Sequence, residues 1–162
     1  MTTKNQKVES YTEINKVSII GSKTETSENA VNTHYVFIAD EDGISLIFTE
    51  LKSKLADNPT GFQTLIYSIN QIEKIPLFKA ELQSLEKRFF HQLEIHYISN
   101  GVNTSLSKYI LQGTLEVVIN SNLNNDMFFN VFGTEKLVDL VMEKLCFLGI
   151  KQNQIVTQKL NN

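Results

Sequence analysis

The chain lacks the features that mark several classes of protein. It has a single cysteine, Cys146, which excludes an internal disulfide framework and a cysteine-rich zinc site. No apolar run approaches the roughly 20 residues that a membrane-spanning helix needs. The N-terminal stretch MTTKNQKVESYTE contains no hydrophobic core, so we expect no signal peptide. Together these absences predict a protein of a reducing, cytoplasmic compartment that does not enter a membrane.

Positive charge is also scarce. The 15 lysine and arginine residues are outnumbered by 18 aspartate and glutamate residues, which gives a formal net charge of −3. Arg88 is the only arginine, although arginine is the usual bidentate partner of phosphate groups. Because nucleic-acid binders carry a basic stripe, this composition argues against a nucleic-acid partner.

The length and composition of the chain predict an N-terminal extension followed by one domain. The chain has 162 residues, of which 41% are hydrophobic, as expected for one globular domain. Residues 1–33 are polar and irregular apart from the segment VSII at 17–20, which predicts a short strand. We therefore predict an N-terminal extension over 1–33 and a domain over 34–162.

Within that domain, apolar segments with strand character alternate with segments of helical periodicity. Strands are predicted at 35–39, 64–67, 93–98, 128–132 and 154–158. Apolar side chains at helical spacing predict helices over 44–55, from Pro76 to residue 89, and over 137–148. The segment 115–119 has strand composition but also fits one or two turns of helix. This order predicts a three-layer α/β/α sandwich around a five-stranded parallel sheet.

The order of these blocks resembles the C-terminal NAD(P)-binding domain of the ferredoxin–NADP reductase superfamily. Within that superfamily the chain resembles the reductase components of phenylacetate- and phenol-type oxygenases. The blocks are YVFIA, a turn ending Gly-Ile-Ser, LIYSI, LEIHYIS, FFNVFG and IVTQKL, and they span residues 34–160. In that family a flavin domain with an Arg-x-Tyr-Ser motif comes first. No such motif occurs here, so the resemblance implies that this chain holds no flavin, and the segment at 17–20 would be a vestige of that domain's last strand.

The first turn departs from the family pattern Gly-Gly-Ser-Gly-Ile-Thr-Pro. Here it reads Asp-Glu-Asp-Gly-Ile-Ser-Leu over 40–46, which keeps Gly43, Ile44 and Ser45. Its carboxylates would repel a pyrophosphate, since each like-charged pair at about 4 Å costs roughly 4 kcal/mol at an effective dielectric of about 20. We predict that Asp42 caps the following helix. Carboxylate oxygens also suit Mg²⁺ or Ca²⁺ or a cationic ligand, but consecutive residues do not easily converge on one ion.

Two further blocks have lost the residues that carry chemistry in the family. The second strand there ends in Tyr-Gly-Asn-Arg, whereas here Tyr67 is followed by Ser-Ile-Asn, and we predict that Tyr67 packs in the core. The family's Cys-Gly-Pro, whose thiol lies beside the nicotinamide, is replaced by Phe132, Gly133 and Thr134. The resemblance implies that the Phe132 ring would fill the nicotinamide pocket, while Thr134 is predicted to cap the next helix.

The resemblance therefore implies remnants of a nucleotide site at Gly43, Ile44, Ser45, Gly133 and Thr134, with no catalytic residue and no metal ligand. We predict a non-catalytic protein that acts through contacts with an unknown protein or a second copy of itself, with no cofactor required. The alternative is the NAD(P)H-binding half of an oxidoreductase whose flavin domain belongs to another chain, a flavoprotein partner.

The remaining reactive side chains are predicted to be structural. The three histidines, His34, His91 and His96, lack the spacing of a zinc-binding helix. Cys146 lies among apolar neighbours, which predicts a buried, inert thiol.

Overall fold

A computed structural model describes residues 32–69, 75–99, 104–123 and 125–160, with only the backbone described for 104–107. The segment at 17–20 therefore lies outside the described residues. Within those ranges the chain alternates strands and helices, ending with a short 3-10 helix, Gln152–Gln154, before the last strand. The strands are β1 (Thr33–Ala39), β2 (Phe62–Ile69), β3 (Leu93–Ser99), β4 (Asp126–Thr134) and β5 (Ile155–Leu160). The helices are α1 (Ile44–Asp57), α2 (Lys79–Arg88), α3 (Thr104–Asn120) and α4 (Glu135–Phe147).

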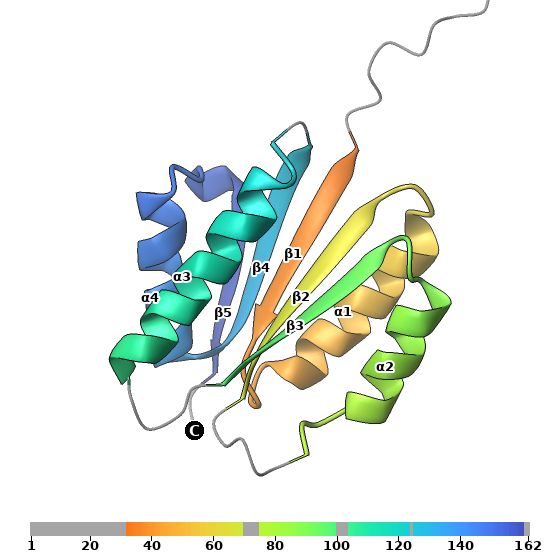
Figure 1. Cartoon of the computed structure of the whole chain (residues 1–162), viewed down its shortest axis with the longest axis horizontal. Coiled ribbons are helices and arrows are strands. Elements are labelled where there is room, and N and C mark those ends of the chain that lie inside the picture. Colours follow the sequence, from red (N-terminus) through yellow and green to blue (C-terminus); the bar gives the residue numbers. More distant parts are fainter. Residues whose placement is uncertain (1–31, 70–74, 100–103, 124, 161–162) are drawn as a thin grey trace, which may run out of the picture. The chain divides into compact units, whose positions relative to one another are not determined.

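The strands form one parallel sheet in the order β3-β2-β1-β4-β5. The chain builds outward from β1 to β3, then returns to place β4 against the other side of β1 (Figure 1). The direction of winding thus reverses between β1 and β4. In open α/β sheets ligands bind at such a reversal, beyond the carboxyl ends of the strands.

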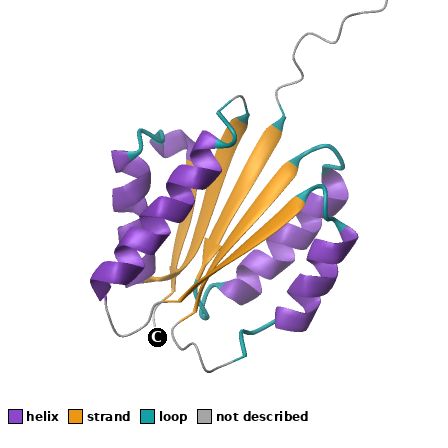
Figure 2. Cartoon of the chain, viewed as in Figure 1, coloured by secondary structure: helices purple, strands orange, loops and turns teal. Residues whose placement is uncertain are grey.

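Helices cover both faces of the sheet, as the sequence predicts. In Figure 2, α1 and α2 lie against one face and α3 and α4 against the other. Strand β1 supplies both cores, because successive side chains of a strand point to opposite faces. Phe37 and Ala39 join the core beneath α1 and α2, whereas Val36 and Ile38 join the core beneath α3 and α4. The predicted three-layer sandwich with a five-stranded parallel sheet is confirmed.

Helical periodicity places the apolar residues correctly in α1 and α4. The side chains of α1 that face the sheet are buried at the predicted positions, Ile44, Ile47, Phe48, Leu51 and Leu55. Helix α4 buries Leu137, Val138, Val141 and Leu145 and is followed by Gly149 with a φ of 80°. A glycine adopts this left-handed conformation without the steric penalty of a side chain, so it suits the end of the helix.

Three local predictions need correction or completion. Pro76 does not open a helix: α2 begins at Lys79, after Phe78, whose φ of 57° is left-handed and whose ring stacks on Phe48 at 4.6 Å between centroids. The ambiguous segment 115–119 belongs to helix α3, not to a strand.

The prediction that Cys146 is buried is wrong, because the structure shows it exposed. It follows the buried Leu145 by one residue, and a step of one residue turns the side chain away from the sheet.

Among the described residues, no helix combines the length and apolar character that crossing a bilayer requires.

Candidate functional site

The candidate site lies where β1 and β4 end side by side. Ala39, the last residue of β1, pairs with Phe132 near the end of β4. Helix α1 starts shortly after β1, and α4 starts directly after β4. Because β1 and β4 end side by side, the N-termini of α1 and α4 lie close together at the carboxyl edge of the sheet, one on each face (Figure 1). Helix N-termini carry free N–H groups and a positive dipole, which together favour an anion.

The anion at this point is a side chain of the protein itself. The carboxylate of Asp40 is buried, with 2% of the residue exposed. Its Oδ1 accepts the backbone N–H groups of Asp42 at 3.2 Å and Gly43 at 3.1 Å. Its Oδ2 accepts the backbone N–H of Thr134 at 2.9 Å and the Thr134 hydroxyl at 2.7 Å. One carboxylate therefore takes four donors from the two turns that a bound anion would contact.

Thr134 extends this network into the second helix. It is the N-cap of α4, and its Oγ1 accepts the backbone N–H of Leu137 at 3.4 Å while donating to Asp40. The predicted cap is confirmed. The Asp40 carboxylate is thus linked to the start of α1 through Gly43 and to the start of α4 through Thr134, and it fixes the two helices to each other across the sheet.

Two glycines allow this close approach. A Cβ added to Gly43 would lie 1.9 Å from the carbonyl oxygen of Phe132, which is backbone and has little room to move. A Cβ added to Gly133 would lie 2.5–2.8 Å from the carboxyl atoms of Asp40. Both glycines are therefore explained by the protein's own packing at this point.

The prediction that Asp42 caps α1 is wrong. The N-cap is Gly43, which makes no side-chain cap, and the carboxylate that receives the N–H groups of this turn comes from Asp40. An aspartate that bonds to the backbone two residues ahead is a common turn device, so the run Asp-Glu-Asp-Gly contained the relevant signal. The bond from Thr134 was not visible in the sequence, because the two residues are 94 positions apart.

The predicted site residues take different positions. Gly43, Gly133 and Thr134 gather around Asp40. Ile44 is buried in the core beneath α1, and its N–H bonds to the Asp40 carbonyl at 3.0 Å. Ser45 is exposed in the first turn of α1.

Aromatic side chains lie next to the site on the α1 face. Phe132 is half-buried and packs against the core beneath α1 and α2. Tyr67 is fully buried, which confirms the prediction that it packs in the core. Burial, followed by the negative charge of Glu41, raises the pKa of the Tyr67 phenol to about 12. No group of three histidine, cysteine, aspartate or glutamate side chains gathers as metal ligands in the part of the chain that the structure describes.

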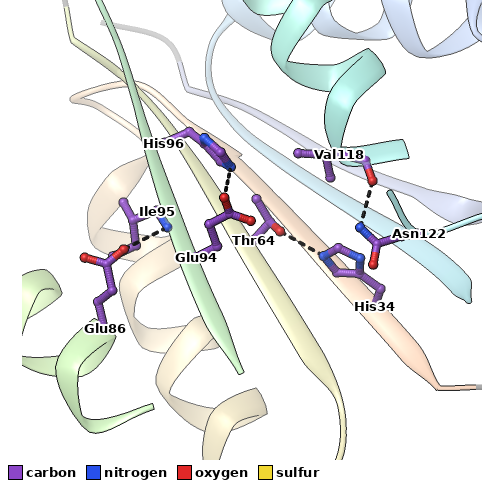
Figure 3. Close-up of polar contacts among 8 residues, drawn as sticks. All are labelled: His34, Thr64, Glu86, Glu94, Ile95, His96, Val118 and Asn122. Carbon is purple, nitrogen blue, oxygen red and sulfur yellow. Dashed lines mark hydrogen bonds and ion pairs between the residues drawn. The ribbon is translucent and has the colours of Figure 1, made fainter. Parts of the chain in front are cut away.

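A second polar cluster lies at the opposite, amino edge of the sheet on the α3 face (Figure 3). His34 Nε2 is 2.9 Å from Thr64 Oγ1, and His96 Nε2 is 3.1 Å from Glu94 Oε1. Burial lowers the pKa of His34, opposed by a hydrogen bond to Asn122 and by the charge of Glu94. A histidine beside a hydroxyl could activate a nucleophile, but His34 and Thr64 are both buried, so no substrate reaches them. The cluster is structural.

No protein-family model matches the sequence, and no curated protein matches it. Solved structures do match. Ferredoxin-NADP+ reductase from Plasmodium falciparum aligns with a TM-score of 0.60 and 22% identity, over 80% of this chain and 52% of that chain. The same reductase with 2'P-AMP aligns with a TM-score of 0.59 and 21% identity, over 80% of this chain and 52% of that chain. Flavohemoglobin from Malassezia yamatoensis aligns with a TM-score of 0.60 and 16% identity, over 85% of this chain and 34% of that chain.

The chain thus spans about half the length of the reductase that it matches. The aligned part, the parallel strand order and the placement of the helices agree with the resemblance in the sequence. The described residues have the fold of the NAD(P)-binding domain of the ferredoxin–NADP reductase superfamily.

Proposed function

We propose that this domain is a non-catalytic member of that fold, closed at its anion-binding point by its own Asp40, and that it acts through protein contacts. The observation that carries the proposal is the set of four hydrogen bonds that the Asp40 carboxylate accepts from Asp42, Gly43 and Thr134. These donors belong to the two helix starts at the reversal of the sheet, where a dinucleotide phosphate would need them.

A pyrophosphate would have to displace the carboxylate before it could bind. Hydrogen bonds to a charged group contribute about 1.5–3 kcal/mol each, so breaking the whole set would cost several kcal/mol. A micromolar dinucleotide gains only about 8 kcal/mol in total. The displaced carboxylate would also remain near the incoming phosphates and repel them. The balance therefore favours the closed turn over nucleotide binding.

The position that carries the thiol in the resembled family supports the same conclusion. Phe132 stands there, and its ring packs against the core beneath α1 and α2. A phenylalanine side chain can neither donate nor accept a proton. With the donors engaged and the thiol replaced, the described residues around Asp40 offer no thiol to assist hydride transfer.

One observation favours the alternative of an NAD(P)H-binding half that works with a flavoprotein. The donors held by Asp40 remain in place at both helix starts, so rotation of this one side chain would free them. The Plasmodium falciparum reductase, which shares this fold over about half of its length, has been solved with 2'P-AMP. On this alternative the wild-type chain binds NADPH at micromolar concentration.

A calorimetric titration of the whole chain with NADH and NADPH separates the two. We expect no saturable binding to the wild type up to millimolar ligand. We expect Asp40→Gly to gain measurable NADPH binding, because its turn keeps the N–H donors and loses the competing carboxylate. Asp126→Asn is the matched control, since it removes one negative charge at the exposed, far end of β4. Micromolar binding by the wild type would overturn the proposal.

The Asp40→Gly protein is used only if its circular dichroism shows that it folds. If it does not fold, Asp40→Asn provides the second variant, because it preserves the shape of the side chain while removing its charge. A rate of acceptor reduction by the wild-type chain with NADH at an enzyme-like level would also contradict the non-catalytic assignment.

A further inference from the structure

The outward face of α3 is unusually apolar for an exposed helix. Its inward side chains, Leu111, Leu115 and Val118, are buried beneath it in the core. Yet Tyr109, Ile110 and Val117 are 73%, 41% and 61% exposed. A helix that covers a sheet normally pairs its apolar stripe with a polar outer face. The exposed apolar residues of α3 therefore make this face a candidate contact surface.

The glycine in the middle of this face has no role in the packing of a single chain. A Cβ added to Gly113 would meet no atom within 4 Å. Glycine in a helix interior is destabilising relative to alanine, so an open site gives no reason for it within one copy. A glycine does allow the backbone of another helix to approach closely.

The outward residues have the spacing of a helix–helix seam. Ile110, Gly113, Val117 and Asn120 follow one another at intervals of three, four and three residues, as in two helices packed along their lengths. Gly113 lies at the centre of this face. Tyr109 and Ile110 precede it by about one turn, and Glu116 and Val117 follow it by about one turn.

This pattern is complementary to itself when two copies of α3 run antiparallel. A two-fold axis at Gly113 brings Ile110 of one copy to within one residue of the level of Val117 of the other, so apolar side chains meet. It brings Tyr109 equally close to the level of Glu116 of the second copy. Within each helix Gln112 donates to Glu116 Oε1 at 2.8 Å, so the phenol hydroxyl can donate to the other oxygen of this carboxylate. A parallel pair would instead bring the two Glu116 carboxylates to the same level, which disfavours it by repulsion.

We propose that two copies of this chain associate through antiparallel α3 helices that cross at Gly113. The self-complementary pattern and the pairing of Tyr109 with Glu116 identify the occupant of this face as a second copy. A single helix crossing is smaller than the roughly 800 Å² per partner of a standard interface, so we expect a weak dimer whose population depends on concentration. The inference deepens the proposed function by naming the protein contact, but it does not depend on the closed turn at Asp40.

Sedimentation velocity of the whole chain, from micromolar to millimolar concentration, tests the interface. The wild type is expected to shift from the monomer mass of 18.5 kDa toward twice that mass. Val117→Glu is expected to weaken association by about tenfold or more, because it places a carboxylate against the apolar seam. Phe147→Glu is the matched control: Phe147 is 75% exposed on α4, and its substitution should leave the dimer intact.

A cross-link tests the position of the axis. In a Cys146→Ser background, which removes the exposed native thiol, Gly113→Cys places two thiols on either side of the proposed two-fold. Mild oxidation is expected to give a covalent dimer, because a disulfide forms only where the Cα atoms come within about 7 Å. Phe147→Cys in the same background is expected to give no covalent dimer under the same conditions.

A wild type that stays monomeric at millimolar concentration overturns the inference. A dimer that Val117→Glu leaves unchanged, or that Phe147→Glu dissociates, also overturns it, because the interface then lies elsewhere. The NADPH titration tests the proposed function separately. If the chain dimerises and also binds NADPH, the closed turn is refuted and the interface stands. If the chain stays monomeric and does not bind NADPH, the interface is refuted and the closed turn stands.

Discussion

Two buried polar clusters lie at opposite edges of one parallel sheet, and they use their polar atoms differently. At the carboxyl edge, each oxygen of the Asp40 carboxylate accepts two hydrogen bonds. At the amino edge, Nε2 of His34 faces the Thr64 hydroxyl, and its environment lowers the pKa of the ring. The first cluster holds a charge that many donors stabilise, whereas the second holds a base that burial keeps neutral.

This difference follows from what each edge of the sheet presents. The carboxyl edge presents two helix starts, so it stabilises an anion, and here a side chain provides that anion. The amino edge lies under the end of α3, where His34 Nε2 is 2.9 Å from Thr64 Oγ1 and Asn122 donates to the Val118 carbonyl (Figure 3). Substitutions in the Asp40 cluster should lower the free energy of unfolding at any ordinary pH. Substitutions at His34 should instead change how the free energy of unfolding depends on pH.

The largest expected effect comes from Gly43→Ala. The added methyl group would lie 1.9 Å from the carbonyl oxygen of Phe132, and neither backbone can yield easily. We expect a loss of about 3 kcal/mol or more in the free energy of unfolding, measured by urea denaturation. Gly113→Ala is the control, with an expected gain of up to about 1 kcal/mol at a concentration where the chain is monomeric. Equal effects at the two glycines would contradict the close packing at the carboxyl edge.

Asp40→Ala should follow in magnitude. The substitution leaves the N–H groups of Gly43 and Thr134 without their acceptor and separates the starts of α1 and α4. We expect the free energy of unfolding to fall by about 2 kcal/mol, because these N–H groups lose a charged acceptor. Asp57→Ala, an exposed position at the end of α1, should change it by less than about 0.5 kcal/mol. A neutral effect of Asp40→Ala would remove the basis for a closed turn.

The amino edge should produce a smaller effect that depends on pH. Because the pKa of His34 is lower in the folded protein than its ordinary value of 6.5, the unfolded chain takes up a proton first as pH falls. Stability should therefore decrease as pH drops below about 6.5, toward the lowered pKa. His34→Gln should flatten this slope, whereas His91→Gln, at an exposed position, should not. Urea denaturation between neutral and mildly acidic pH measures it, and an unchanged slope in His34→Gln would refute the assignment.

Tyr67→Phe should have the smallest effect at neutral pH. The phenol is buried and its pKa is raised to about 12, so the folded protein keeps its proton where an unfolded tyrosine, with an ordinary value of 10.0, loses it. The wild type should lose stability as pH rises from about 10 to 12, and Tyr67→Phe should lose less. At pH 7 the change should stay within about 1 kcal/mol. An ultraviolet titration that shows every tyrosine ionising near pH 10 would contradict the burial of this group.

Most of the fold could be predicted from local patterns. Strands β1 and β2 read as apolar runs because both of their faces are covered, and α1 and α4 show clear helical spacing. Helix α3 was ambiguous because Val117, Val118 and Ile119 are β-branched, a composition that favours strands. In the structure, the buried residues Leu111, Leu115 and Val118 follow at intervals of four and three residues, which is the spacing of a helix.

The candidate site was predicted less completely. Gly43, Gly133 and Thr134 could be identified because they remain in recognisable turns, and their convergence follows from the parallel sheet. The role of Asp40 could not be predicted, because it depends on a contact between residues 94 positions apart. The sequence indicated repulsion of a phosphate by this turn. The structure adds that the carboxylate also occupies the donors the phosphate would need.

The most direct measurement is a nuclear magnetic resonance titration of the ¹⁵N-labelled whole chain with NADPH and, separately, inorganic pyrophosphate. The amide signals of Gly43 and Thr134 report on the two N–H groups that Asp40 holds at the helix starts. The closed turn predicts that neither signal shifts saturably up to millimolar ligand in the wild type, and that Asp40→Gly restores the shifts. Saturable shifts of both signals in the wild type would show that the donors are free for a phosphate and would contradict the account.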